Sequence, residues 1–141
     1  MEKRVSSRAI IIDNNRLLTM FRRKIKNGKT KEYYVIPGGG KEDNETLEEN
    51  VVRELKEEFN VDIKVLGFLG KEEHENTIEY YFHCTIINGE PKLGGEELER
   101  MTEENYYEVR KINIEDLDSI DINAKDKVQM ALNNEYIDIN I

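Results

Sequence analysis

Three successive glycines that follow a proline constrain this chain most, because a charged helix begins directly after them. Pro37 fixes one backbone angle, and the glycines at positions 38–40 accept conformations that other residues avoid. Bare backbone can therefore come close to a phosphate-bearing ligand where the chain enters the helix. Thr46 and Glu49 have the spacing of a capping box, and Asn60 suits a left-handed cap. These signals predict a helix over residues 46–59.

The predicted helix has an apolar stripe and an acidic flank. The stripe consists of Leu47, Val51, Leu55 and Phe59, with Val52 beside it. Glu54, Glu57 and Glu58 follow at spacings of three and four, which gathers three carboxylates on another flank. Like charges at this spacing destabilise a bare helix by about 0.2 to 0.5 kcal/mol per pair. Mg²⁺ takes carboxylate oxygens as ligands and would reverse that sign. Arg53 is one turn from Glu57 and can steady its carboxylate.

This stretch resembles the Nudix box of the Nudix (MutT-like) hydrolase family, over residues 39–61. The pattern Gly-x5-Glu-x7-Arg-Glu-(apolar)-x-Glu-Glu-x-Gly-(apolar) is filled by Gly39, Glu45, Arg53, Glu54, Leu55, Glu57, Glu58 and Val61. Asn60 stands where the family usually has glycine, and asparagine is the next-best residue for a left-handed cap. Residues 34–38 resemble the strand that leads into the box, with tyrosine at position 34 where tryptophan is frequent.

The resemblance implies a single Nudix hydrolase domain over residues 1–141. It also implies an α/β fold in which a mixed β-sheet is sandwiched between α-helices, and the order of the predicted elements argues for the same three layers. The implied activity is Mg²⁺-dependent hydrolysis, by attack of water at phosphorus, of a nucleoside diphosphate linked to another group. The expected partner is thus a small-molecule nucleotide, with a nucleoside triphosphate as the default substrate.

The resemblance also assigns roles to the residues of the box. The expected ligands of Mg²⁺, for which Mn²⁺ is a possible substitute, are the Gly38 carbonyl, Glu54, Glu57 and Glu58. Glu54 either accepts the proton of the attacking water or joins the metal ligands, and Arg53 is grouped with it as a catalytic residue. Arg53 and Glu45 are expected to hold the glycine segment and the helix in register.

Other interpretations of the same residues remain open. Acidic runs on helices are usually solvated faces, although a solvated face needs neither the glycines nor an arginine among the carboxylates. A noncatalytic module that binds a nucleotide or a metal is a second possibility, which the complete set of three glutamates disfavours. Isomerisation of an isopentenyl diphosphate is a third. It is disfavoured because the chain is short and Cys84 lies on a predicted strand without evident activation.

Composition excludes several kinds of partner. Thirty acidic and 21 basic residues give a net charge of -9, which disfavours duplex nucleic acid and anionic membranes. Cys84 is the only cysteine, so no internal disulfide is possible and no zinc cluster is indicated. The apolar run at residues 9–12 is too short for a signal peptide, and no segment approaches membrane-spanning length. A cytoplasmic location is therefore expected.

The remaining elements follow from alternation and turn signals. Strands are predicted over residues 4–12, 16–24, 32–36, 61–69 (continuing toward His74), 77–87 and 106–112. Polar loops are predicted over residues 26–31 and 92–104, and a short helical turn over residues 114–117. A helix over residues 124–132 is expected to be capped by Asn123 and to bury Val128, Ala131 and Leu132. Residues 136–141 alternate like a strand that could pair with another chain, so a homodimer is possible.

Several side chains outside the box are candidates for substrate binding. Arg22 and Arg23 could receive outer phosphates, although charged residues that protect a sheet edge are the favoured explanation. Tyr80, Tyr81 or Phe82 could stack on a base, although core packing on one face of their strand is the leading explanation. His74 and His83 are each more simply explained as partner-satisfied or solvent-facing.

The glutamate-rich segment over residues 92–104 is a further candidate region. Enzymes that this chain resembles often recruit one more glutamate from there, to complete the metal ligands or to act as the base. Glu97 and Glu104 are the residues to test first. Tyr80 lies near where diadenosine polyphosphate hydrolases place a tyrosine, while Asn76 and Thr77 stand where some ADP-ribose hydrolases carry a proline. The nucleotide therefore stays unidentified.

Overall fold

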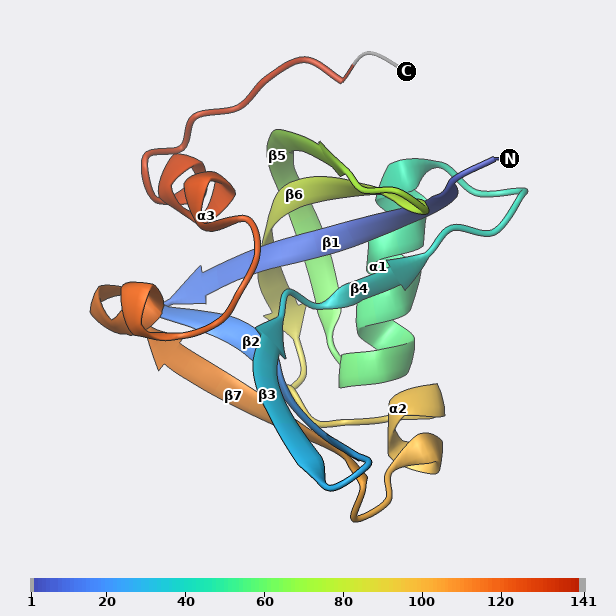
Figure 1. The fold of residues 1–141 in the computed structure, drawn as a ribbon. Helices are drawn as coiled ribbons and strands as arrows, with labels where there is room; N and C mark the ends of the chain where they lie inside the picture. The colour runs from blue at the N-terminus through green and yellow to red at the C-terminus, as the bar shows by residue number, and fades with distance from the viewer. Residues whose placement is uncertain (1, 140–141) are drawn as a thin grey trace.

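In the part of the chain that the structure describes, seven strands form one mixed sheet with helices on both of its faces (Figure 1). The structure is a computed structural model and describes residues 2–139, apart from the side chains of Glu96 and Glu97. The strands are β1 (Arg4–Asp13), β2 (Arg16–Lys26), β3 (Lys29–Val35), β4 (Gly38–Gly40), β5 (Asp62–Glu73), β6 (Thr77–Asn88) and β7 (Asn105–Asn113). The helices are α1 (Leu47–Phe59), α2 (Gly95–Arg100) and α3 (Lys125–Leu132), with a 3₁₀ turn, η1 (Ile114–Ser119). Among the described residues, no helix is long and apolar enough to cross a membrane.

Strand β1 lies at the centre of the sheet and joins its two halves. The strand order is β3-β2-β1-β6-β5, with β4 also paired to β1 and β7 also paired to β2. β1 runs parallel to β6, and the other pairs are antiparallel. Arg8 of β1 lies opposite Gly38 of β4 and Tyr81 of β6. The predicted mixed sheet between helices is confirmed, and its central strand lies between the glycines of β4 and strand β6.

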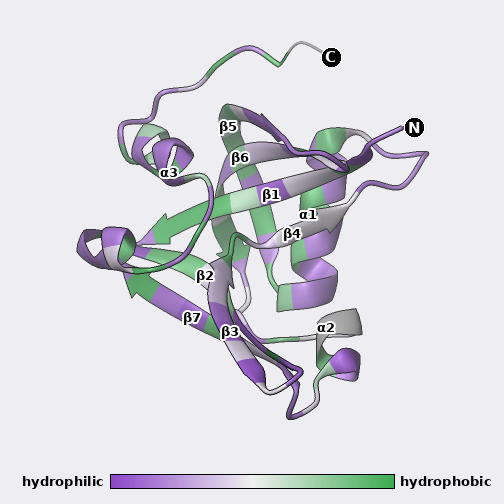
Figure 2. Ribbon diagram, viewed as in Figure 1, coloured by the Kyte–Doolittle hydropathy of each residue, from purple (hydrophilic) through white to green (hydrophobic). Residues whose placement is uncertain are grey.

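Two apolar layers hold the helices to the sheet. Figure 2 shows hydrophobic residues along the strands between α1 and α3. The stripe predicted for α1 is buried against one face of the sheet, while α3 packs on the other face through Val128 and Ala131. On β6, Phe82 belongs to the layer under α1 and Tyr81 to the layer under α3. The expectation of a single core face on β6 was therefore wrong, because a helix covers each side of this strand.

Two-residue turns connect the first three strands. Asn14 and Asn15 have positive φ angles of 51° and 60°, and Asn27 and Gly28 have φ angles of 53° and 73°. Paired positive φ angles are typical of the tight turns that match the twist of antiparallel strands. The polar loop expected over residues 26–31 is thus wrong, because β2 and β3 extend up to the Asn27-Gly28 turn.

The structure also corrects the C-terminal third of the chain. Part of the loop expected over residues 92–104 is the helix α2. α3 begins at Lys125 after Ala124, whose φ is 67°, and no side chain caps it, so the Asn123 cap was wrong. Residues 135–139 form no strand, and residues 140 and 141 of the predicted tail strand lie outside the described residues. Instead, the Ile137 amide donates to the Phe68 carbonyl of β5 at 2.9 Å.

The predicted capping box is present at the start of α1. The Glu49 amide donates to Thr46 Oγ1 at 3.1 Å, and the Thr46 amide donates to Glu49 Oε1 at 2.8 Å. At the other end, Asn60 has φ 58° and ψ 34°, the left-handed cap predicted from sequence. Both ends of the helix are therefore fixed by the residues that the sequence indicated.

Loss of the Thr46 hydroxyl is expected to destabilise the protein. Thr46→Ala removes the acceptor of the Glu49 amide and should lower the free energy of unfolding by about 1 kcal/mol. Thr46→Ser keeps the hydroxyl and serves as the matched control. Denaturant unfolding followed by circular dichroism checks this, and equal stability of the alanine and serine variants would contradict it.

Candidate functional site

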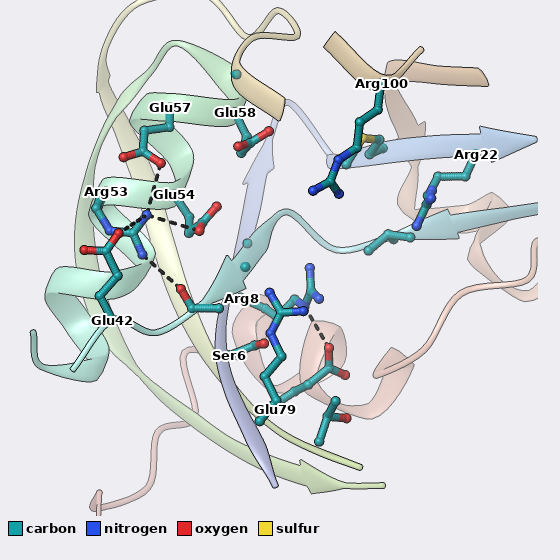
Figure 3. A pocket seen from close by; sticks show the side chains of 18 residues that line it. Ser6, Arg8, Arg22, Glu42, Arg53, Glu54, Glu57, Glu58, Glu79 and Arg100 are labelled. Atoms are coloured by element: carbon teal, nitrogen blue, oxygen red, sulfur yellow. Dashed lines mark hydrogen bonds and ion pairs between the residues drawn. The ribbon is translucent and has the colours of Figure 1, made fainter. Parts of the chain in front are cut away.

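A polar cavity of about 600 Å³ opens between β4, α1 and the strands β1, β2 and β6. Figure 3 shows the carboxylates of α1 on one side of it and Arg22 and Arg100 on the other. Its charged lining residues are Arg4, Arg8, Arg22, Glu42, Arg53, Glu54, Glu57, Glu58, Glu79 and Arg100. Opposite charges on facing walls suit a ligand that carries both negative oxygens and bound cations.

The three α1 glutamates meet at the cavity as their spacing predicted. One carboxylate oxygen from each of Glu54, Glu57 and Glu58 lies within 4.8 Å of the others. Glu58 is 6% exposed at the edge of the apolar stripe, whereas the Glu57 side chain is 51% exposed. The cluster therefore reaches from the protein interior to solvent, so that an ion could bind without complete burial of all three charges.

The three glycines form the short strand β4 where a loop was expected. β4 pairs with β1 and passes close to the Glu54 carboxylate. A Cβ added at Gly38, whose φ is 155°, would overlap the Ser7 carbonyl oxygen. A Cβ added at Gly39 would lie 2.5 Å from the Glu54 carboxylate. Gly38 is thus required by the close approach of β4 to the backbone of β1, and the absence of a side chain at Gly39 leaves room for the Glu54 carboxylate.

The Arg53 side chain connects the glycine strand to the acidic helix. It donates two hydrogen bonds to Glu45, at 2.7 and 2.9 Å, and one to the Gly40 carbonyl at 2.9 Å. Its Nη1 donates to Glu54 at 3.2 Å and to Glu57 at 3.0 Å. Within the described part of the chain, these five bonds match the five N–H donors of a guanidinium. Arg53 therefore orients its neighbours, as predicted for it and Glu45.

The charges of this pair are fixed by their contact. The hydrogen bonds from Arg53 lower the pKa of Glu45, and the bonds to Glu45 raise the pKa of Arg53 further above its usual range. Glu45 also accepts the Glu42 amide at 2.9 Å, so it holds the chain between β4 and α1. A bidentate ion pair of this geometry stays charged at neutral pH.

Arg22 and Arg23 lie on opposite faces of β2. Arg22 lines the cavity, donates to the Tyr107 hydroxyl at 2.9 Å and lies 4.6 Å from the centre of that ring. Arg23 lies over Tyr106, 4.8 Å from its ring centre, and is not among the described residues that line the cavity. Because β2 is paired with β3 and β7 on both sides here, the sheet-edge explanation is wrong. Of the two arginines, only Arg22 lines this cavity.

Several further residues of the site were missed by sequence reasoning, among them three arginines and a buried asparagine. Arg4, Arg8 and Arg100 line the cavity, the first two from β1 and the third from α2. Asn50, which is 0% exposed, donates from Nδ2 to the Gly39 and Gly40 carbonyls at 3.3 and 3.1 Å. A polar residue at a buried position of α1 was the one available sequence signal, and it identifies Asn50.

Of the other predicted binding residues, Tyr80, Phe82 and Glu104 are not among the described residues that line the cavity. Tyr80 and Phe82 are 7% and 1% exposed in the core under α1, so neither offers an exposed ring face to a base. Both rings pack in the core, which was the alternative to base stacking. Glu104 is exposed before β7 and is not among the described lining residues. The side chain of Glu97 lies outside the described residues.

Neither histidine lines the cavity. His83 is 9% exposed, its Nδ1 lies 2.8 Å from the Tyr136 hydroxyl, and burial lowers the pKa of its ring. His74 is half-exposed beside Glu72 and Glu79, with its Nε2 at 3.7 and 3.4 Å from their carboxylates. Both histidines therefore have polar partners, as the simpler explanation predicted.

The α1 cluster fits a hard divalent cation. All three of its donors are carboxylate oxygens, which Mg²⁺ and Mn²⁺ prefer, whereas it offers no histidine or thiolate ligand. Arg53 bonds to two of the three carboxylates and offsets part of their repulsion. Gly38, whose carbonyl was the predicted fourth ligand, lines the same cavity.

The chain is similar in sequence and in fold to known hydrolases. A curated ADP-ribose pyrophosphatase of Methanocaldococcus jannaschii is 37% identical over 91 residues, which cover 60% of this chain and about half (52%) of that protein. A MutT NUDIX hydrolase from Burkholderia pseudomallei has the same fold, with a TM-score of 0.69, 20% identity, and coverage of 94% of this chain and 98% of the other. An ADP-ribose pyrophosphatase from Streptococcus suis superposes with a TM-score of 0.65 at 16% identity, covering 98% and 96%. A family model described as NUDIX domain matches residues 2–128, and the chain therefore belongs to the Nudix hydrolase family.

Proposed function

We propose that this protein hydrolyses the diphosphate linkage of a small nucleotide by attack of water at phosphorus. The observation that carries the proposal is one cavity in which the carboxylates of Glu54, Glu57 and Glu58 converge opposite Arg22 and Arg100. A diphosphate carries several negative charges that repel a nucleophile, and an arrangement of this kind neutralises them from two sides. Retention of all three glutamates supports catalysis over a noncatalytic binding module.

In this proposal Glu57, Glu58 and the Gly38 carbonyl hold Mg²⁺, for which Mn²⁺ could substitute. When bound, the ion neutralises phosphate oxygens and so reduces the repulsion that opposes attack. Glu54 either accepts the proton of the attacking water or adds a third carboxylate to the ion. Arg53 and Glu45 are positioning residues, because they fix the carboxylates and the glycine strand to one another.

The arginines on the facing wall would bind the phosphate oxygens of the substrate. Arg22 is pre-oriented, because Tyr107 holds its guanidinium by a hydrogen bond and by its ring. Arg100, on the exposed α2, would approach the substrate from the solvent side (Figure 3). Guanidinium groups bind phosphate by paired hydrogen bonds, so this wall orients the substrate as well as attracting it.

Two substrate classes have separate support. The name of the Methanocaldococcus jannaschii relative supports ADP-ribose. A nucleoside triphosphate is supported by the number of cavity arginines and by Asn76 and Thr77, which stand where some ADP-ribose hydrolases carry a proline. A hydrolysis screen over nucleoside triphosphates, nucleotide sugars, ADP-ribose and dinucleoside polyphosphates, with Mg²⁺ and with chelator, tests the proposal and ranks the substrates.

Neutralising Glu54 should remove most of the turnover while leaving the fold intact. Glu54→Gln keeps the size of the side chain but loses a proton acceptor, and kcat is expected to fall by about 10² or more. Glu48→Gln is the matched control, because Glu48 is exposed on the same helix and does not line the cavity. Release of phosphate or pyrophosphate measures the effect. Near-normal hydrolysis by Glu54→Gln would remove Glu54 from the mechanism.

Metal uptake should depend on the α1 carboxylates. Calorimetric titration of Mn²⁺ or Mg²⁺ is expected to show binding that Glu57→Gln and Glu58→Gln each weaken by at least about tenfold, because each variant loses an anionic ligand. Glu48→Gln should bind the ion as the original chain does. Absence of uptake by the original chain, with and without nucleotide, would contradict the proposed chemistry.

Acid should remove the contribution that the Glu45–Arg53 ion pair makes to the stability of the folded protein. The pKa of Glu45 is lowered in the folded state, so the contribution is fully present above the ordinary glutamate pKa of about 4.3 and is lost as the pH falls through the lowered value. Denaturant unfolding should therefore show a gap in stability between the original chain and Glu45→Gln that is wide near about pH 7 and narrows below about pH 4. A gap that is constant across this range would contradict the ion-pair role.

A further inference from the structure

Arg8 lies where the polar cavity meets a smaller neighbouring cavity. The second cavity has a volume of about 240 Å³, and its lining shares Arg8, Val35 and Glu79 with the first. The side chains of Arg8 and Glu79 are 19% and 14% exposed, so both charges are largely withdrawn from solvent. A charged pair at the boundary of two cavities is in a position to contact any ligand that extends from one into the other.

The Arg8 guanidinium is oriented by two hydrogen bonds to neighbouring residues. Its Nε donates to Glu79 Oε1 at 2.9 Å, and its Nη1 donates to the Ile36 carbonyl at 3.1 Å. These bonds use two of the five N–H donors of the group. Figure 3 shows Arg8 beside Glu79 at the lower part of the cavity, near Ser6. The side chain is therefore held in one orientation and keeps donor capacity for a ligand.

Glu79 is in turn contacted by Tyr81 and His74. Tyr81, which is 2% exposed, donates its hydroxyl to Glu79 Oε2 at 3.3 Å. Burial, and then the charges of Glu79 and Glu72, raise the pKa of Tyr81, so its hydroxyl remains a donor at physiological pH. His74 Nε2 lies 3.4 Å from the same carboxylate oxygen. Both oxygens of Glu79 are thus engaged, and only one of them by Arg8.

We propose that Arg8 is a specificity-determining residue that binds a phosphate oxygen of the nucleotide at this boundary, and that Glu79 is the residue that positions it. The inference rests on the proposed function for the class of ligand. Glu79 offsets the positive charge of Arg8, so the pair has little net charge. A ligand would therefore be bound mainly by the oriented N–H donors of Arg8 and less by long-range attraction. Arg8 therefore selects a ligand by where its oxygen lies, whereas the more exposed Arg100 attracts negative charge in general.

Equilibrium binding of a nucleotide that is not turned over tests this inference separately from hydrolysis. The probe is the α,β-methylene analogue of ADP, titrated with Mg²⁺ present and followed by calorimetry. Arg8→Gln is expected to weaken binding by about tenfold, the usual effect of losing a charge-assisted hydrogen bond. Arg8→Lys keeps the positive charge but has no planar guanidinium to bond Glu79, the Ile36 carbonyl and a phosphate oxygen together, so it should also weaken binding severalfold. If Arg8→Gln does not fold, Arg8→Lys takes its place in the test. Arg16→Gln, at an exposed strand end, is the matched control and should bind as the original chain does.

The role of Glu79 is tested by combining variants. Glu79→Gln should weaken binding by about threefold in the original chain and have no further effect in the Arg8→Gln background, because it acts through Arg8. A general structural effect of Glu79 would persist in both backgrounds and would overturn the positioning role. Unchanged binding by Arg8→Gln would overturn the proposal itself. Loss of binding in these variants, in a protein that hydrolyses no tested nucleotide, would refute the proposed function and leave the Arg8 site standing.

Discussion

The geometry of the site depends on the hydrogen bonds of one guanidinium. Arg53 ties Glu45, the Gly40 carbonyl, Glu54 and Glu57 together with bonds of 2.7 to 3.2 Å. It therefore joins the segment before α1, the glycine strand and the acidic flank into one unit. A single positive charge among so many carboxylates offsets part of their repulsion and leaves an excess of negative charge. This local excess of negative charge is what the proposed divalent cation would neutralise.

The part of the site that lies on α1 could be predicted from the sequence, because its geometry is local. Spacings of three and four in a helix place Glu54, Glu57 and Glu58 together whatever the rest of the chain does, and the caps at Thr46 and Asn60 fix the ends of that helix. The fold class was also predictable from the sequence, and the structure confirms it. The order of the predicted elements argued for two helical layers around a mixed sheet, and the resemblance to the Nudix family implied the same.

The cavity arginines of β1 and α2 could not be predicted from the sequence, because long-range pairing assembles this part of the site. Arg4 and Arg8 reach the cavity only because β1 pairs with both β4 and β6, and Arg100 only because residues 95–100 form a helix where composition indicated a loop. The sheet-edge explanation for Arg22 failed for the same reason. Strand periodicity indicates which side chains share a face, but it does not indicate how many neighbours a strand will have.

The position of β1 also determines when the site can form during folding. Arg8 and Glu79 are 71 positions apart in the chain, whereas the capping box and the carboxylate cluster of α1 span a few turns of one helix. Contacts between distant positions require closure of a long loop and form late. A chain that has formed α1 alone thus presents the acidic flank with Arg53 but without the cavity arginines of β1, β2 and α2, and so lacks the complete cavity. If nucleotide binds as proposed, it requires the finished fold and by mass action would protect that fold against unfolding.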